Sequence, residues 1–238
     1  LASVSTQADR KAVQSVILAI YRPWLESGAN LFQNILSVKG LQGYSQTTLP
    51  KPQTGTCIIF CDAFRLDAAK TLAYELERQG FTCPISTKLA ALPSTTATSK
   101  PALILINDRV SGKGMTGLDP AQKDAKSKLT ADAFRKILAS LGYQILKDDE
   151  YGDPTGIGWT ELGAIDAYGH QHGWKVAHHL RSELDNIKNR ILSLLDHGWK
   201  SILVVTDHGW LMLPGGLPQA ELPEHLTMVR KGRCARLK

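Results

Sequence analysis

The sequence predicts an α/β protein with a three-layer αβα core, in which helices cover both faces of a largely parallel sheet. Two apolar runs of strand length, at 57–61 and 202–205, support this prediction, and each is followed at once by polar residues. Between them, residues 177–194 carry apolar side chains three and four positions apart, as in an amphipathic helix. Strands that alternate with helices are typical of parallel sheets buried between helical layers.

The first expected element is a helix in segment 1–50, outside the α/β domain at 51–238. Thr6 and Asp9 have the spacing of a capping box. The apolar residues that follow at helical spacing are Val13, Val16, Ile17, Ile20, Tyr21, Trp24 and Leu25. A loop at about 43–55, which contains two glycines and two prolines, separates this helix from the first strand.

The remaining elements are expected in chain order. Helices are expected at 66–79, from 96 toward 106, near 130–141 and at 177–194. Gly198 supplies a stop signal for the last of these helices, and a strand at 201–206 follows it. Residues 107–158 are rich in Gly, Lys and Asp, and we expect them to be an insertion, either a cap over a site or a plain connector.

Carboxylates and histidines stand at the ends of several expected elements. The last strand ends in Asp-His-Gly, which alone is equally compatible with a turn closed by glycine. Another carboxylate follows the first strand, and a third lies close to a histidine in a glycine-containing bend at 166–170. The six residues are Asp62, Asp166, His170, Asp207, His208 and His225. Three carboxylates and three histidines are the ligands expected of paired transition-metal sites, at the sheet edge where α/β proteins place ligands.

Five motifs stand in order between about residue 56 and the C-terminus. They are Asp62-Ala63-Phe64-Arg65, Pro93-Ser94-Thr95-Thr96, Asp166-x-x-Gly-His170, Thr206-Asp207-His208-Gly209 and Leu213-Pro214-Gly215-Gly216-Leu217-Pro218. In this order the motifs resemble the PglZ domain of the alkaline phosphatase superfamily. The resemblance implies an alkaline-phosphatase-like core with a cap inserted at 107–158. It also implies membership of a BREX phage-defence system, whose other proteins would be partners.

The resemblance further implies two divalent metal ions, usually zinc, with manganese or magnesium as alternatives. Carried over residue by residue, it puts one ion on Asp62, Asp207 and His208, and the other on Asp166, His170 and His225. His172 lies two residues from His170 and is a second candidate for the same ligand position.

The same resemblance implies that Thr96 is the catalytic nucleophile, in a Pro-x-x-Thr segment that opens a helix. A metal ion lowers the pKa of such a hydroxyl, and a helix N-terminus favours an anionic phosphoryl group. Ser94 and Thr95 are alternatives, and all three hydroxyls are also compatible with an N-cap role.

Two cations are candidates to bind the phosphate oxygens. Arg65 and Lys100 lie near the expected phosphate position in the sequence. Arg65 is equally expected to pair with Asp67 or Glu75 on the following helix. Many relatives carry Asp-Gly where this chain has Asp62-Ala63, so a turn that tolerates positive φ is expected to be reshaped.

The composition is that of a soluble globular chain, with 43% hydrophobic and 21% charged residues. The formal net charge is +6, and basic residues concentrate in two groups. The groups are Lys123, Lys126, Lys128, Arg135 and Lys136, and Arg230, Lys231, Arg233, Arg236 and Lys238. They are compatible with contacts to a nucleic-acid backbone or with a solvated face.

The chain carries no apolar run of the roughly 18 residues that a membrane span requires, and its start lacks the order of a signal peptide. Its start at Leu1, without Met, predicts a segment of a larger protein. The four cysteines, Cys57, Cys61, Cys83 and Cys234, have no metal-ligand spacing. We therefore expect a reducing, cytoplasmic environment without a membrane partner.

The leading hypothesis is a hydrolase acting on phosphate esters, a two-metal phosphodiesterase or nuclease of phage defence. In this mechanism Thr96 attacks phosphorus, and water then hydrolyses a phosphothreonine intermediate. The partners would be a phosphate-ester substrate, DNA among the candidates, and other defence proteins. The alternatives are a monoesterase or phosphatase acting on a small molecule or a phosphoprotein, and a metal-binding docking subunit of the defence complex.

Overall fold

The computed structural model describes residues 6–40, 48–104, 106, 108–111, 117–123, 127–216, 221–231 and 234–238. Its centre is a sheet formed by β1 (Thr56–Phe60), β4 (Tyr143–Leu146), β5 (Ile157–Glu161) and β6 (Ser201–Val205). The strand order is β4-β5-β1-β6, and every pairing is parallel. The predicted α/β class with a parallel sheet is therefore confirmed.

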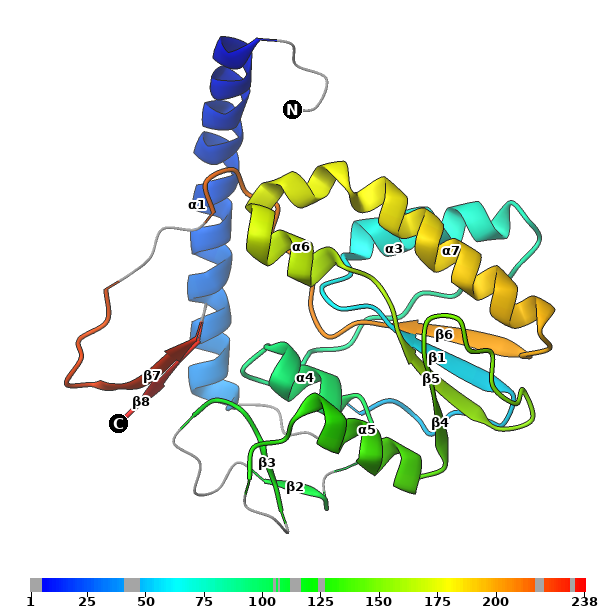
Figure 1. Cartoon of the computed structure of the whole chain (residues 1–238). Helices are drawn as coiled ribbons and strands as arrows, with labels where there is room; N and C mark the ends of the chain where they lie inside the picture. Colours follow the sequence, from blue (N-terminus) through cyan, green and yellow to red (C-terminus); the bar gives the residue numbers. More distant parts are fainter. Residues whose placement is uncertain are drawn as a thin grey trace.

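Helices cover both faces of the sheet (Figure 1). Successive residues of β1 point to opposite faces, and all five are buried. Cys57 and Ile59 pack with residues of α3 (Leu66–Glu77) and α7 (Leu180–Asp196). Ile58 and Phe60 pack with residues of α5 (Ala131–Ser140) on the other face. The sheet is thus the middle of three layers.

Most predicted helices are present, with bounds that local chemistry explains. Thr130 caps α5, since its hydroxyl oxygen accepts the Ala133 N–H at 3.2 Å. The helix expected from residue 96 toward 106 is shorter: α4 spans Thr96–Ala102, and Pro101 in its last turn has no N–H to continue the helix. The helix predicted at 177–194 begins at Leu180, after α6 (Ile165–His172) and the 3-10 helix η1 (Gly173–His178).

Segment 107–158, expected to be an insertion, contributes to the central layers. Within it, α5 packs on the sheet and β4 is an edge strand. The short antiparallel pair of β2 (Val110–Ser111) and β3 (Ala121–Gln122) lies outside the central sheet. Much of the segment expected to be an inserted cap thus belongs to the central layers, because the apolar residues of α5 and β4 cover and extend the sheet.

The helix expected in segment 1–50 is α1 (Gln7–Lys39), and the predicted capping contact is confirmed. The Thr6 hydroxyl oxygen accepts the Asp9 N–H at 3.1 Å. No residue of α1 is buried. In the view of Figure 1, α1 lies between the three layers and a hairpin of β7 (Thr227–Lys231) and β8 (Cys234–Leu237). Among the helices of the described residues, none is both long enough and apolar enough to cross a membrane.

The four cysteines are free thiols. Cys57 and Cys61 have no exposed surface, whereas Cys83 and Cys234 are half-buried. Burial raises the pKa of both Cys57 and Cys61 to about 12. These two thiols act as small apolar residues of the core.

Candidate metal centre

The carboxyl ends of β1 and β6 bring two predicted ligand segments together. The two strands are parallel neighbours, with Phe60 opposite Val205, so the residues just beyond them meet at the same sheet edge. Asp62 follows β1, while Asp207 and His208 follow β6. The Thr206 hydroxyl links the segments that follow the two strands. Its oxygen accepts a hydrogen bond from the Phe64 N–H at 3.1 Å, and it donates one to the His208 carbonyl at 2.9 Å.

The turn after Asp62 keeps a positive φ although it lacks glycine. Ala63 has φ 59, the left-handed conformation that glycine adopts at little cost. The residue is fully buried, and its carbonyl accepts the Trp210 N–H at 3.1 Å. The expectation that Ala63 reshapes this turn is therefore wrong: surrounding contacts hold the alanine in the conformation that glycine would adopt.

The opening residue of α4 places a hydroxyl beside these ligands. Thr96 Oγ1 donates toward Asp62 Oδ1 at 3.2 Å and Oδ2 at 3.3 Å. It is also 3.3 Å from Nε2 of His208. Thr95 is the N-cap residue of α4, but its hydroxyl makes no capping bond and is buried without a partner in the described chain. Of the two threonines, only Thr96 faces the carboxylate and the imidazole.

Asp166 and His170 lie on a helix and not in the expected bend. Both belong to α6, four residues apart, and His170 Nε2 is 3.4 Å from Asp166 Oδ2. Gly169 is buried within this helix, and the indole ring of Trp210 occupies the position of its absent side chain, 2.4 Å from an ideal Cβ. The glycine therefore serves close packing between α6 and the segment after β6, not a turn.

Ligand atoms of three predicted residues converge. One ligand atom each from Asp62, Asp166 and His208 lies within 4.8 Å of the others, the one such group of three or more found among the described residues. Asp207 is adjacent, with Oδ2 3.7 Å from His208 Nε2. Donor atoms around a tetrahedral ion stand about 3.4 Å apart when each is about 2.1 Å from the metal. The 3.5 Å separation of Asp62 Oδ1 and His208 Nε2 fits that edge.

Burial and repulsion between like charges raise the pKa values of carboxyl groups in this cluster. Burial, with repulsion from Asp207 and Asp166, raises the pKa of Asp62 to about 7, although the Thr96 hydrogen bond and the charge of Lys100 oppose the shift. Burial also raises the pKa of Asp207 above its usual range, against the attraction of His208. Three carboxylates at one sheet edge therefore favour either a bound proton or a bound cation.

The donor set fits a divalent metal ion. Asp207 has no exposed side-chain surface, and within the described chain its Oδ2 has no hydrogen-bond partner. A buried carboxylate oxygen without a donor is costly unless a cation satisfies it. His208 Nδ1 is likewise buried without a partner, so the carboxylate or carbonyl that often orients a metal-bound histidine is not among the described contacts. Oxygen and nitrogen donors together suit zinc or manganese.

The second predicted ligand set, Asp166, His170 and His225, does not converge as the first set does. Asp166 joins Asp62 and His208, whereas the His170 side chain is 72% exposed and contacts Asp166 and the Trp210 ring. His225 is exposed in the turn that precedes β7 and is not part of the converging group. α6 therefore turns Asp166 toward the ends of β1 and β6, and His170 is the predicted histidine that contacts it.

Both predicted phosphate-binding cations are engaged by carboxylates. Arg65 forms hydrogen bonds to both oxygens of Asp67 and to the Trp210 carbonyl, which is the alternative that the sequence left open. Lys100 Nζ is 2.7 Å from Glu161 Oε2 and 4.5 Å from the centre of the Phe60 ring. Asp67 and Glu161 therefore compete with any phosphate for these two cations, whose predicted role in phosphate binding stays a prediction.

Two residues that the sequence does not single out hold the site elements in place. Glu161, at the end of β5, accepts hydrogen bonds from both Arg135 and the Trp159 indole as well as pairing with Lys100. Trp210 links the turn at Ala63 to α6. Glu161 had no signal comparable to that of Asp62, because the glycine in β5 hides the strand that Glu161 ends.

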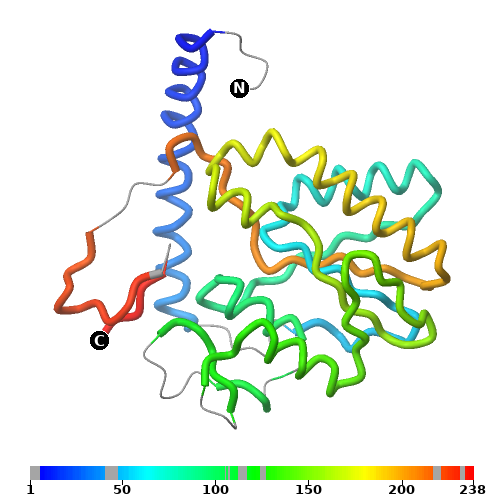
Figure 2. Tube along the Cα trace, viewed as in Figure 1, coloured from blue at the N-terminus to red at the C-terminus, as the bar shows by residue number. Residues whose placement is uncertain are grey.

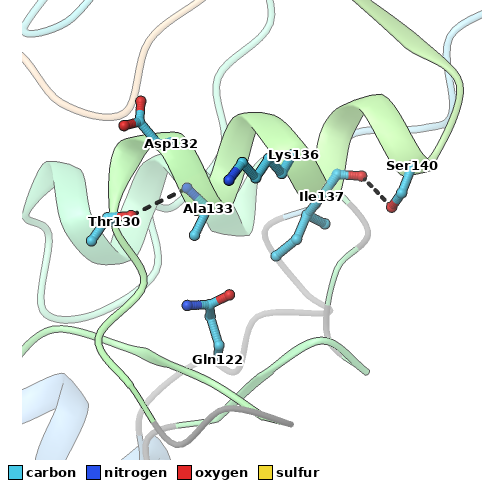
Figure 3. A pocket seen from close by; sticks show the side chains of 7 residues that line it. All are labelled: Gln122, Thr130, Asp132, Ala133, Lys136, Ile137 and Ser140. Carbon is cyan, nitrogen blue, oxygen red and sulfur yellow. Dashed lines mark hydrogen bonds between the residues drawn. The ribbon is translucent and has the colours of Figure 1, made fainter.

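A separate hollow lies on α5, away from the converging carboxylates. It has a volume of about 350 Å³ and is open to solvent. Figure 3 shows Gln122 facing the helix residues Thr130, Asp132, Ala133, Lys136, Ile137 and Ser140 across it. None of these residues belongs to the candidate metal centre. Lys136 is one of the predicted basic group, in which Arg135 pairs with Glu161 and Lys128 with Asp119. Lys126 and Arg233 lie outside the described residues, as do Leu217 and Pro218 of the last motif.

Comparison with protein-family models, curated proteins and solved structures finds no match to this chain. A function must therefore be inferred from the residues at the sheet edge.

Proposed function

We propose that the chain is a metal-dependent phosphodiesterase of the PglZ type, with an alkaline-phosphatase-like core. The convergence of the Thr96 hydroxyl with Asp62 and His208 is the observation that carries this proposal. A nucleophilic hydroxyl beside carboxylate and imidazole ligands, at the carboxyl edge of a parallel sheet, is the arrangement that metal-assisted phosphoryl transfer requires.

Asp62, Asp207 and His208 would hold one divalent ion, with Asp166 as a shared or additional ligand. Asp166 and His170 would contribute to a second ion, for which the described chain offers two donors. Bound zinc or manganese would lower the pKa of the hydroxyl and stabilise negative charge on the phosphoryl oxygens.

Thr96 is oriented for attack by the residues around it. Its hydroxyl donates toward Asp62 Oδ1 at 3.2 Å, which orients the oxygen, and the proton would leave as the oxygen attacks and pass to the leaving alcohol. The Thr96 oxygen forms a bond to phosphorus as the bond to the leaving alcohol breaks, which leaves a phosphothreonine. Water then cleaves this ester and restores the hydroxyl.

The charges around Thr96 favour a diester over a monoester. With one divalent ion bound among Asp62, Asp166 and Asp207, the site would still carry a net negative charge, and the two nearby cations, Arg65 and Lys100, are already paired with carboxylates. A phosphodiester carries a single negative charge, so it needs less compensation. DNA is the diester that we propose, and other proteins of a phage-defence system are the proposed partners.

The decisive experiment compares Thr96→Ala with Thr95→Ala on a panel of aryl diesters, aryl monoesters and DNA, with zinc or manganese present. Thr96→Ala should abolish turnover of diesters while metal content stays at the parental level, because the hydroxyl attacks but is not needed to hold the ion. Thr95→Ala is the matched control, since it removes an equal hydroxyl that faces no ligand. Loss of activity in the control with activity retained in Thr96→Ala would contradict the assignment.

A metal-loaded parent that is inert toward every phosphate ester would contradict the proposed activity. It would favour the docking-subunit alternative, in which the metal centre has a structural role.

A further inference from the structure

The longest helix of the chain presents an apolar surface that nothing in the described chain covers. α1 has 33 residues, about 50 Å at 1.5 Å per residue, and none is buried. Its first turns extend beyond the rest of the described chain (Figure 2). Its large apolar side chains that are at least 37% exposed are Val16, Ile20, Tyr21, Trp24, Leu31, Phe32, Ile35 and Val38.

The apolar residues follow the spacing of a coiled coil. Steps of four and three residues run through positions 13, 17, 20, 24, 27, 31, 34 and 38, the alternation of a seven-residue repeat. The residues at these positions are Val13, Ile17, Ile20, Trp24, Ser27, Leu31, Asn34 and Val38. Six of the eight are apolar, and Val38 is 85% exposed. These eight positions form a narrow apolar seam along α1, which matches the apolar stripe of another helix better than it matches a globular surface.

The positions beside the seam carry no charge. The flanking positions of the repeat hold Gln14, Val16, Tyr21, Pro23, Gly28, Asn30, Ile35 and Ser37. Charges at these positions normally select one partner helix and reject another. Without them, a second copy of the same helix brings no like charges together. The ion pair of α1, Arg22 with Glu26, lies outside the seam.

The exposed area is of the size that a stable dimer buries. Of the eight exposed side chains, all except Phe32 lie on the seam or beside it. Together the eight are exposed by between 37 and 85% and offer roughly 800 Å², about what each partner contributes to a standard interface. Pro23 and Gly28 weaken the helix in isolation, since proline lacks the N–H and glycine lacks a restraining side chain. A helix of this composition gains its stability mainly from packing of the apolar face.

We propose that α1 pairs with α1 of a second copy of this chain in a parallel two-stranded coiled coil. Parallel pairing sets Asn34 against Asn34 and Ser27 against Ser27, so each polar side chain meets a partner able to form a hydrogen bond. Antiparallel pairing about the middle of the seam would instead place Asn34 opposite Ile17. The side-chain amide of Asn34 would then have no hydrogen-bond partner. The inference does not depend on the proposed hydrolase activity.

Sedimentation equilibrium of the chain under reducing conditions tests the pairing. The parent should form a dimer that dissociates on dilution. Leu31→Lys and Val38→Lys should each weaken dimerisation by on the order of 100-fold, because the dimer buries two ammonium groups. Ala19→Lys and Gln33→Lys place the same charge on the opposite face and should leave the dimer intact. Circular dichroism of each variant confirms that the domain is folded.

Cross-linking tests the orientation. Val38→Cys should form a covalent dimer under mild oxidation, whereas Gln33→Cys should not exceed the parent, which carries the native cysteines. A parent that is monomeric at all concentrations would overturn the proposal, as would a dimer equally sensitive to substitutions on either face. Failure of Val38→Cys to cross-link, or binding of a monomer to lipid vesicles through the same residues, would also overturn it.

Discussion

Ala63 is held in a conformation that costs a non-glycine residue about 1–2 kcal/mol. Replacement by glycine would relieve this cost but lose a buried methyl group, worth about 0.8 kcal/mol, and add freedom to the unfolded chain. We therefore expect Ala63→Gly to change the free energy of unfolding by less than about 1 kcal/mol. Ala63→Val should lose about 3 kcal/mol, because a β-branched residue is both strained and overpacked there.

Urea denaturation of both variants measures the difference. A valine variant as stable as the parent would show that Ala63 does not have a positive φ.

We expect Asp207 to destabilise the metal-free protein and to be required for metal binding. Its buried carboxylate lies beside Asp62, so Asp207→Asn should raise the free energy of unfolding of the metal-free protein by about 1 kcal/mol, or roughly 2–4 °C in Tm. The same variant should lose the rise in Tm that zinc or manganese gives the parent. Thermal denaturation with and without metal tests both parts. A less stable metal-free variant would mean that Asp207 has a structural role.

Asp62 should make the metal-free protein less stable as pH rises. Its folded-state pKa of about 7 lies above the ordinary value of 3.8, so the folded state binds the proton more tightly than the unfolded state does. This contribution to stability is fully present below about pH 4 and is lost as pH rises to about 7. Tm of the metal-free parent should therefore increase from pH 7.5 to pH 5. Asp62→Asn should show a smaller increase, since the pKa of Asp207 is also raised, and an identical pH profile in both proteins would contradict the assignment.

At the scale of elements, Glu161 connects three of them, since it ends β5 and pairs with Lys100 of α4 and Arg135 of α5. Loss of these pairs should let α4 shift and displace Thr96. A displacement of about 1 Å can cost on the order of 100-fold in rate. We expect Glu161→Gln to lower kcat for an aryl diester at least tenfold while KM and metal content change little.

The control is Asp132→Asn, which removes a partner of Arg135 but none of Lys100. If Lys100 acts through Glu161, the double variant Glu161→Gln with Lys100→Met should be no slower than either single variant. Additive losses would show that Lys100 acts on the substrate directly.

The elements differ in how well the sequence predicts them. β1 and β6 follow from apolar runs, α3 from the helical spacing of its apolar residues, and α5 from a clear cap. β5 carries a glycine, Gly158, whose missing side chain makes room for Cys57 and Trp199, and β4 is short and half polar. The strands β4 and β5 both depend on neighbours that are distant in the sequence, so the local sequence pattern could not identify them.

The candidate site shows the same limit. Asp62, Asp207 and His208 could be placed together because parallel strands end at one edge, and Thr96 follows from its motif. The position of Asp166 depends on the direction in which α6 crosses the sheet. The partners of Arg65 and Lys100 depend on Asp67 and Glu161, which compete with any phosphate for these cations.

At the scale of the whole molecule, the net charge of +6 favours a polyanion, but part of the predicted basic group is neutralised internally. Lys123 and Lys136 are exposed and are the better test of DNA binding. Each phosphate contact contributes about −0.9 to the slope of log affinity against log salt concentration. Lys123→Glu with Lys136→Glu should reduce that slope by about 2 in a fluorescence anisotropy titration.

Lys70→Glu with Arg78→Glu changes the charge equally on α3 and its C-terminal cap, across the sheet, and should leave the slope unchanged. Equal slopes for all three proteins would remove the segment around α5 from the DNA surface.

The buried thiols of Cys57, within β1, and Cys61, just beyond it, also allow the rate at which the sheet opens to be measured. With a pKa of about 12 and no exposed surface, Cys57 and Cys61 present almost no thiolate to an alkylating reagent while the chain is folded. Cys83 and Cys234, at the surface, are modified first. The slow second phase of labelling then follows excursions of the whole sheet under native conditions, without denaturant. Its slowing by a divalent ion would report occupation of the sheet edge from a distance, through residues that never touch the ligand.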